Sequence, residues 1–501
     1  MTTAAGSGVV HRGRALWLST ISFTVCFAVW MIFAIIGIKI QKELGLSNFE
    51  LGLLQATPVL SGSLIRLVLG VWTDQYGGRR IFTLVMLSAA VAAFCLTLAH
   101  TYSQFLVAAL FLGVAGGSFA VGTAYVTRFY ESGKQGLALG IFGAGNVGAA
   151  VTKLSAPPLI EFYGFSWQHV AYIWAAAIFV MGIIFWMFSE EDPVVRERRE
   201  KGIKPKSAWL EFQPLKNIQV WRFSLYYFYV FGAFVALSLW LPKYLMAVYN
   251  IDLFTGGQIA AAFSIPASVF RAYGGHLADR YGARRVMYWS LMVGAAATFV
   301  LSYPAMDIVV RTVKGPVTFH YGMSLLFFAV MGSVLGFFMA LGKAAVYKHI
   351  PVYYPHNMGA VGGLVGMIGG LGGAVLPPVF GLLVDLTGVW QTCFMLLFAL
   401  VMVSLTWMHV SIRRMERGAT GEALRKLPEF PEMQPVHTPD MVGAMAGKVL
   451  AEWQPEDKKF WEGGGRKIAR RNLWISIPNL LLAFAIWQVW SVVVAQLPRV
   501  G

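Results

Sequence analysis

The chain has 501 residues, of which 57% are hydrophobic and only 13% are charged, and its mean hydropathy is +0.62. A composition this apolar excludes an ordinary soluble domain and is typical of a multi-pass membrane protein. The net charge of +16 invites a nucleic-acid-binding interpretation. However, lysine and arginine gather in alternate loops, so we expect no nucleic-acid partner and interpret the charge as a topology signal and a contact with anionic lipid.

Apolar segments long enough to cross a bilayer as helices recur along the chain. Six are expected within residues 1–188, at 15–38, 49–72, 81–100, 103–127, 135–160 and 167–188. Six more are expected within 222–411, at 222–249, 256–278, 286–306, 318–347, 358–384 and 390–411. A thirteenth follows at 473–497. The prediction is an all-α membrane protein with 6+6 transmembrane helices and one extra C-terminal helix.

The loop at 189–221 separates the two predicted bundles and carries seven lysines and arginines. The loops on the opposite side hold little beyond Lys42, Arg311 and Lys314. Because basic loops stay on the cytoplasmic side of a membrane, we expect this loop and the N-terminus to be cytoplasmic. The expected location is the bacterial inner membrane.

One motif, G-x-x-x-D-x-x-G-x-R-R, follows both the second and the eighth predicted span. Its glycines would let helices approach closely, its aspartates would cap and pair across a helix end, and its arginines would anchor at the anionic leaflet. We interpret it as a cytoplasmic gate; the alternative is a tight basic turn. The fixed residues are Gly70, Asp74, Arg79 and Arg80 in the first copy, and Gly275, Asp279, Arg284 and Arg285 in the second.

Two matching motifs in two sets of six spans are typical of transporters built from parallel repeats. Over residues 1–411 the chain resembles the major facilitator superfamily.

Arg66 and Arg271 each lie inside an apolar span, four residues before a copy of the motif. An arginine inside a membrane span is costly, so it defaults to a functional hypothesis. Of the 24 acidic residues, nine lie in 412–470 and the others lie in loops or near predicted span ends. Neither arginine therefore has a carboxylate at its depth, and a planar guanidinium suits a planar oxyanion. The alternative is that Arg66 extends to the interface.

The predicted fifth and eleventh spans are dense in glycine, which implies close packing, bending or backbone beside a ligand. Asn146 is the one amide in the fifth-span cluster and could donate to an anion. The glycines concerned are Gly140, Gly143, Gly145 and Gly148 in the fifth span, and Gly362, Gly366, Gly369, Gly370 and Gly372 in the eleventh.

Paired glycine-rich spans with one arginine in the second span and one in the eighth resemble the nitrate/nitrite porter family. The resemblance implies that Arg66 and Arg271 hold the substrate between the two halves. It also implies that Tyr227 and Phe231, and more loosely Phe119, lie against the substrate as aromatic walls that exclude water. The partners implied are nitrate and nitrite, with no cofactor.

Lys343, near the end of the tenth span, could add a third positive group, carry a proton, or extend to the interface. The absence of a membrane-embedded carboxylate favours nitrate/nitrite exchange. Lys343 and the run Cys26–Phe33, which resembles the symporter-like branch of the family, favour proton symport. The coupling stays open, with symport slightly favoured.

The tail repeats the start of the chain. Arg14–Ser19 matches Arg471–Ser476, and Phe27–Trp30 matches Phe484–Trp487, at one constant offset. Residues 471–501 therefore look like the first span of a second porter, joined through a charged, proline-rich cytoplasmic linker at 412–470. The alternative is an ordinary accessory helix.

Two other functions stay open: a facilitator for another small anion, such as cyanate or a monocarboxylate, and a sensor that binds the anion without moving it. An enzyme is not expected, because no catalytic triad, paired carboxylates or metal-ligand spacing occurs in the sequence.

Overall fold

The computed structural model describes residues 7–130, 135–191, 218–313, 315–353 and 358–418, together with Glu462 and Arg470. The chain divides into two compact units, one of residues 1–305 and 322–433 and the other of 306–321 and 434–501. The predicted thirteenth span at 473–497 and almost all of the linker beyond residue 418 lie outside the described residues.

The first unit is helical, and its helices follow the predicted spans closely. Its earlier part holds α1 (Ser7–Trp30), η1 (Ile32–Ala34), α2 (Ile36–Leu44), α3 (Asn48–Tyr76), α4 (Gly78–Leu96), α5 (Tyr102–Leu112), η2 (Gly113–Gly117), α6 (Ser118–Thr127), α7 (Gln135–Gly143), η3 (Ala144–Val147), α8 (Gly148–Glu161) and α9 (Trp167–Phe188). Its later part holds α11 (Ile218–Tyr227), η5 (Phe228–Ala233), α12 (Phe234–Tyr249), α13 (Leu253–Val269), α14 (Arg271–Tyr281), α15 (Ala283–Leu301), α16 (Leu325–Tyr353), α17 (Met358–Thr387) and α18 (Thr392–Gly418).

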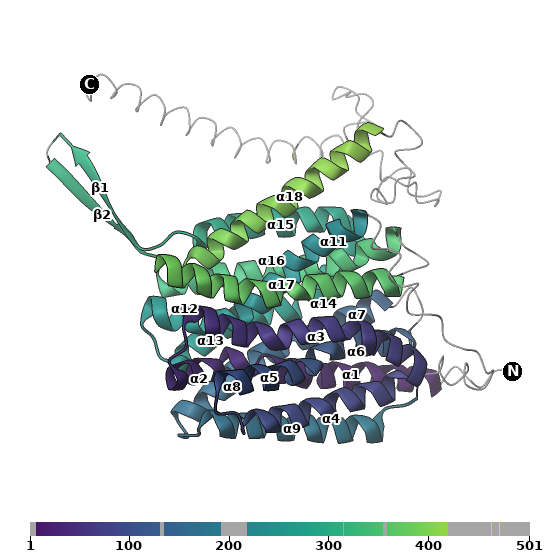
Figure 1. The fold of residues 1–501 in the computed structure, drawn as a ribbon. Coiled ribbons are helices and arrows are strands. Elements are labelled where there is room, and N and C mark those ends of the chain that lie inside the picture. Colours follow the sequence, from purple (N-terminus) through teal and green to yellow (C-terminus); the bar gives the residue numbers. More distant parts are fainter. Residues whose placement is uncertain are drawn as a thin grey trace. The chain divides into compact units, whose positions relative to one another are not determined.

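Within this unit the long helices run alongside one another, as Figure 1 shows with α1, α4 and α9 in purple and blue and α16 and α17 in green. Long apolar helices suit a bilayer because each satisfies its own backbone polar groups. Sequence signals set several starts. Ser47 and Glu50 form a capping box at the start of α3, and Thr101 and Gln104 form another at the start of α5.

The first, fourth, fifth, seventh and eighth predicted spans are not continuous helices, contrary to the prediction; the first divides into α1, η1 and α2. The fourth tightens to a 3-10 helix at η2, the fifth does so at η3, and the seventh widens to a π-helix at η5. The eighth bends by 41° between α13 and α14. Glycine is the physical reason in η2, where three of five residues are glycine and the α-helix loses stability.

By length and composition, nine helices among the described residues could cross a membrane, or ten when α13 and α14 count as one span. The predicted spans at 135–160 and 286–306 do not meet that test. The helical membrane architecture is thus present, while the count of twelve stays a prediction.

Residues 306–321 form an antiparallel hairpin, in which β1 (Met306–Thr312) pairs with β2 (Gly315–Tyr321). The predicted tenth span began at residue 318, and that boundary is wrong because α16 begins at Leu325. Valine, threonine and aromatic residues make this segment apolar enough to resemble a span, but they also favour a strand.

At the ends of α3 and α13 that lie away from the arginine motifs, the two halves of the first unit hold each other through helix caps. The carboxylate of Asp385, on α17, accepts hydrogen bonds from the backbone N–H groups of Asn48 and Phe49 at 3.3 and 2.8 Å. The carboxylate of Glu161, on α8, accepts from Leu253 and Phe254, both at 3.0 Å. Each carboxylate satisfies amides that a helix start leaves without a partner.

Candidate anion site between the two halves

Arg66 lies in the middle of α3, and only 4% of its surface is exposed. Its Nε donates to the carbonyl of Gly116 in η2 at 3.1 Å, and its Nη1 donates to the carbonyl of Gly366 in α17 at 2.9 Å. The side chain is thus buried against both halves, and it does not extend to the surface as the alternative interpretation required.

Arg271 opens α14 just after the bend and is also 4% exposed. Its guanidinium carbon lies 5.2 Å from the ring centre of Phe119 and 5.6 Å from that of Tyr347. Among the described residues, its Nη1 has no hydrogen-bond partner. A buried donor without a partner is costly, so this atom is poised to bind an acceptor.

Phe119 joins the two arginines. Its ring centre lies 5.7 Å from the guanidinium carbon of Arg66, so the same ring contacts both side chains. The guanidinium of Arg66 also lies 5.5 Å from the ring of Phe231, onto which Tyr227 stacks at 5.0 Å. The structure therefore brings together the two arginines and three aromatic residues that sequence reasoning selected.

Asn146 lies in η3 and is fully buried. Neither its amide oxygen nor its amide nitrogen has a hydrogen-bond partner among the described residues. An amide without a partner for either atom is rare in a protein interior, and it is a further donor available to an anion.

Glycines of the two dense spans lie against the arginine site. A Cβ added at Gly143 would lie 2.9 Å from Cδ of Arg271, and one added at Gly370 would lie 3.1 Å from Nη1 of Arg66. A Cβ at Gly369 would lie 2.3 Å from the Tyr227 ring. These positions need glycine because the side chains of the site occupy the space.

The other glycines of these spans pack helices together or face looser space. A Cβ at Gly145 or Gly148 would collide with α1, one at Gly372 with Gly232, and one at Gly140 would lie 3.1 Å from Ala272. At Gly362 and Gly366 the nearest atoms belong to Tyr347, at 3.6 and 2.8 Å.

Tyr347 was not selected from the sequence, although it contacts Arg271, Phe119 and Tyr227 by ring distances of 5.6, 6.2 and 5.1 Å. The sequence feature that could have identified Tyr347 is its position, one helical turn beyond Lys343 on the same face of α16.

Lys343 is fully buried, and its Nζ lies 3.4 Å above the ring centre of Phe234 with no hydrogen-bond partner among the described residues. Burial excludes its extension to the interface.

A second buried lysine, Lys153 of α8, was also missed. It is 0% exposed and donates to Ser264 of α13. The same rule that flagged the arginines, a cation within an apolar span, identifies it.

The two arginine motifs end α3 and α14. Gly77 and Gly282 adopt φ angles of 91° and 84°, which disfavour any other residue and produce the turn into the next helix. Asp279 pairs with Lys348 of α16. Gly70 and Gly275 do not make the expected close helix contact, because a Cβ at either would meet no atom within 4 Å.

The motif arginines differ between the copies. Arg79 donates to the carbonyl of Trp186 at 2.6 Å from Nη2. Arg80 and Arg285 are exposed, whereas Arg284 is partly buried. Asp74 lies in α3, and its side chain is outside what the structure describes.

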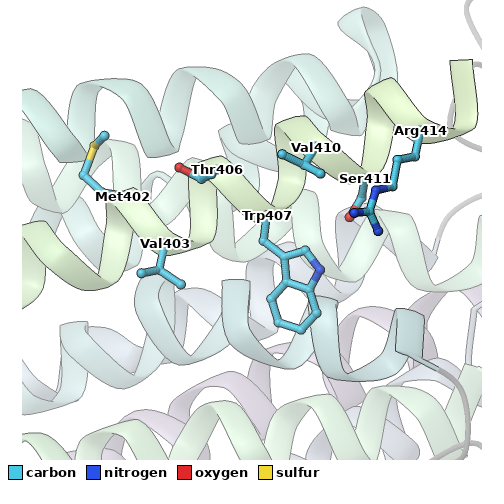
Figure 2. A pocket seen from close by; sticks show the side chains of 7 residues that line it. All are labelled: Met402, Val403, Thr406, Trp407, Val410, Ser411 and Arg414. Carbon is cyan, nitrogen blue, oxygen red and sulfur yellow. The ribbon is translucent and has the colours of Figure 1, made fainter. Parts of the chain in front are cut away.

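Two surface hollows among the described residues are lined by residues outside this site. One of about 570 Å³ runs along α18, and Figure 2 shows that its seven lining residues, including Trp407 and Arg414, all belong to that helix. Another of about 450 Å³ lies between α4 and α9 and is lined by Arg80, Leu84 and Trp186, among others. Among the described residues no cluster of metal-ligating side chains occurs.

The arrangement suits the binding of a small anion. The described residues place no carboxylate in an ion pair with Arg66 or Arg271, so both positive charges are uncompensated within the part of the chain that the structure describes. Buried charges of this kind gain strongly from an ion of opposite sign.

Comparisons with known proteins agree with this chemistry. The model of the Major Facilitator Superfamily matches residues 18–323 and 259–500. The chain is 42% identical over 415 residues to the "Probable nitrate/nitrite antiporter NarK1" of Thermus thermophilus, covering 81% of this chain and 92% of that protein. It is 28% identical over 397 residues to the "Nitrite extrusion protein" of Bacillus subtilis, covering 79% and 94%.

Solved structures give the same fold. A bacterial homologue of the human lysosomal transporter Spinster superposes with a TM-score of 0.61 at 14% identity, covering 82% of this chain and 99% of that one. The human organic anion transporter MFSD10 gives 0.58 at 15% identity, covering 79% and 99%. The chain is therefore a multi-pass membrane transporter that belongs to the nitrate/nitrite porter family of the major facilitator superfamily.

Proposed function

We propose that this transporter moves nitrate and nitrite across the bacterial plasma membrane, with its N-terminus in the cytoplasm. The observation that carries the proposal is the pair of buried arginines that both contact the Phe119 ring, neither of them paired with a described carboxylate. Each guanidinium group is planar and carries paired N–H donors. Such a pair suits a flat oxyanion that presents two of its oxygens to the arginine. The relatives named for nitrate and nitrite support the choice of anion.

Transport proceeds by alternating access. The bundles at 1–188 and 222–411 rock about the site, joined by the loop at 189–221. Contacts of Arg66 with both Gly116 and Gly366 support this, because one side chain then bridges the two halves and feels their relative motion. Residues 412–470 and 471–501 act as a linker and as the first helix of a second porter unit.

The roles divide among the side chains. Arg66 and Arg271 bind the anion, Asn146 donates a further hydrogen bond, and Lys343 supplies long-range positive charge. Phe119, Tyr227 and Phe231 wall the site and exclude water, which strengthens every contact between the arginines and the anion. The motif residues at the ends of α3 and α14 form the cytoplasmic gate.

The test is counterflow in proteoliposomes. Vesicles preloaded with unlabelled nitrate or nitrite should take up labelled nitrate quickly, whereas vesicles preloaded with cyanate or formate should not. Uptake driven equally by cyanate or formate would indicate a facilitator for other small anions. Saturable nitrate binding without any uptake would indicate a sensor and contradict the proposal.

A further inference from the structure

Lys153 is a buried charged residue outside the arginine site. It lies on α8, where its ammonium group donates to the hydroxyl of Ser264. That hydroxyl lies 3.2 Å from the hydroxyl of Ser238 on α12. Lys153 belongs to one half of the transporter and both serines belong to the other, so this contact joins the halves.

Comparison with the other half shows that packing does not require a lysine there. Pro157 and Pro377 begin the double prolines at the ends of the two glycine-rich spans. Their separation of 220 residues makes Gly373 the counterpart of Lys153 in the duplicated chain. Arg66 and Arg271 are 205 residues apart, and the same separation makes Val59 the counterpart of Ser264.

These offsets describe equivalent contacts. They pair Gly257 with Gly52, and a Cβ at either would touch the matching proline of the facing helix, at 3.0 Å from Cγ of Pro157 and 2.4 Å from the Pro377 carbonyl. A Cβ at Gly373 would likewise lie 3.0 Å from Val59. Of the two equivalent contacts between the halves, one packs Gly373 against Val59, and the other buries Lys153 against Ser264.

The partner of Lys153 suits an amine that changes its charge. A carboxylate would fix the lysine as an ammonium, whereas a serine hydroxyl accepts from an ammonium and donates to a neutral amine equally well. Ser264 has this freedom, because its alternative acceptor, the carbonyl of Ala260, lies at 3.2 Å.

Lys343 is held differently. Its Nζ lies directly above the Phe234 ring, and a ring face favours a cation. Lys153 is fully buried and, among the described residues, has neither a ring face nor a carboxylate beside its ammonium group. Of the two lysines it is therefore the one that can be neutral while the site is empty.

No described carboxylate forms an ion pair with either lysine. The carboxylates on their own and neighbouring helices are bound elsewhere, Glu161 to the start of α13, Asp252 to Thr255 and Asp279 to Lys348. Other titratable groups on these helices include Cys26 on α1, Tyr227 on α11, Tyr229 in η5, Tyr347 on α16 and Arg271 on α14.

Resting on the transport function proposed above, we propose that Lys153 carries the proton that accompanies nitrate. The neutral amine takes a proton from water on the outer side when the anion enters, because the anion's charge stabilises the ammonium. It returns that proton to water on the inner side when the anion leaves. One N–H bond forms and breaks, and nitrate is neither reduced nor covalently bound.

The test measures anion and proton movement separately in proteoliposomes, with nitrate counterflow at equal pH and with a trapped pH dye under a pH gradient. Lys153→Gln should keep counterflow but lose both the proton entry that accompanies nitrate and the stimulation by outside acid. Lys153→Arg, with a permanent charge, should also lose proton entry. Lys343→Gln is the matched control and should weaken nitrate binding while keeping the stimulation.

The outcomes are distinct. Nitrate-dependent proton entry through Lys153→Gln, or a wild-type protein that exchanges nitrate for nitrite without moving protons, overturns the role of Lys153 and leaves anion transport intact. A wild-type protein that moves neither anion overturns the proposed function itself. Loss of counterflow in both Lys153 variants, with folding shown intact by size-exclusion chromatography, makes the lysine part of anion binding and also contradicts the proposal.

Discussion

The two arginines hold equivalent places in the duplicated chain, yet their surroundings differ. Arg66 lies within the unbroken helix α3 and gives hydrogen bonds to two backbone carbonyls in opposite halves. Arg271 starts α14 after a bend and keeps Nη1 without a partner among the described residues. Duplication explains the equivalent positions of the two charges, and the local backbone decides their contacts: Arg66 bridges the two halves, while Arg271 keeps a donor atom available.

Replacing either arginine by lysine should have the largest effect. A hydrogen bond to a charged group contributes about 1.5–3 kcal/mol, so loss of one fork predicts a decrease in nitrate counterflow of about tenfold to a hundredfold. Arg66→Lys should also lower the unfolding temperature, since it loses the carbonyls of Gly116 and Gly366. Equal unfolding temperatures for Arg66→Lys and Arg271→Lys, measured in detergent, would remove the distinction between them.

The glycines facing each arginine give the next test. Gly143→Ala would push into Arg271 and Gly370→Ala into Ser63 and Arg66, and overpacking of this kind costs about 1–3 kcal/mol. Because Arg271 is less tethered, Gly143→Ala should mainly raise the KM for nitrate, whereas Gly370→Ala should also reduce stability. Gly363→Ala is the control, since no atom lies within 4 Å of its Cβ; a similar rise in KM there would indicate a general effect on the helix.

The carboxylates of Glu161 and Asp385 join the two halves at the helix ends that lie away from the arginine motifs, and the third test concerns this junction. Charge at a helix start contributes about 0.3–1 kcal/mol, so Glu161→Gln and Asp385→Asn should each loosen the junction slightly and together more. The readout is the labelling rate of a cysteine at position 55, where the buried Gln55 donates to the Leu239 carbonyl across the halves at 3.1 Å.

Glu43→Gln serves as the matched control for the caps, because Glu43 accepts from Trp167 within one half. Labelling that is as fast in this control as in the double cap variant would show that the caps do not hold the junction.

The smallest effect concerns Asp252, the N-cap of α13, whose counterpart at the start of α3 is Ser47. Hydrogen bonds from Thr255 lower the pKa of Asp252 below its ordinary value of 3.8. A lowered pKa means stability that is present above pH 3.8 and is lost as the pH falls through the lowered value. Asp252→Ala should therefore reduce the unfolding temperature at neutral pH but not at a pH where Asp252 is protonated; an equal reduction at both would contradict this.

Much of the site could be predicted from the sequence. A cation in an apolar span is rare enough to mark Arg66 and Arg271, and the family resemblance supplied Phe119, Tyr227 and Phe231. The dense glycines indicated close packing, and Gly143, Gly369 and Gly370 lie against site side chains.

Other features depend on tertiary contacts that periodicity does not report. The sequence shows Lys153 as a cation within an apolar span, but its contact with Ser264, 111 residues away, depends on the tertiary fold. The breaks at η2, η3 and η5 could not be predicted from hydropathy, because each of these spans is predominantly apolar. The sequence predicts part of the hairpin at 306–321 as helix, because apolar β-branched residues fit the patterns of both a membrane helix and a strand.

The most direct measurement is nitrate binding to the purified protein by isothermal titration calorimetry at fixed ionic strength. One nitrate should bind per wild-type chain, and binding should be lost in the Arg66→Lys/Arg271→Lys double variant while that variant still folds. Nitrate bound by the double variant as tightly as by the wild type would show that the anion rests elsewhere and would contradict the account.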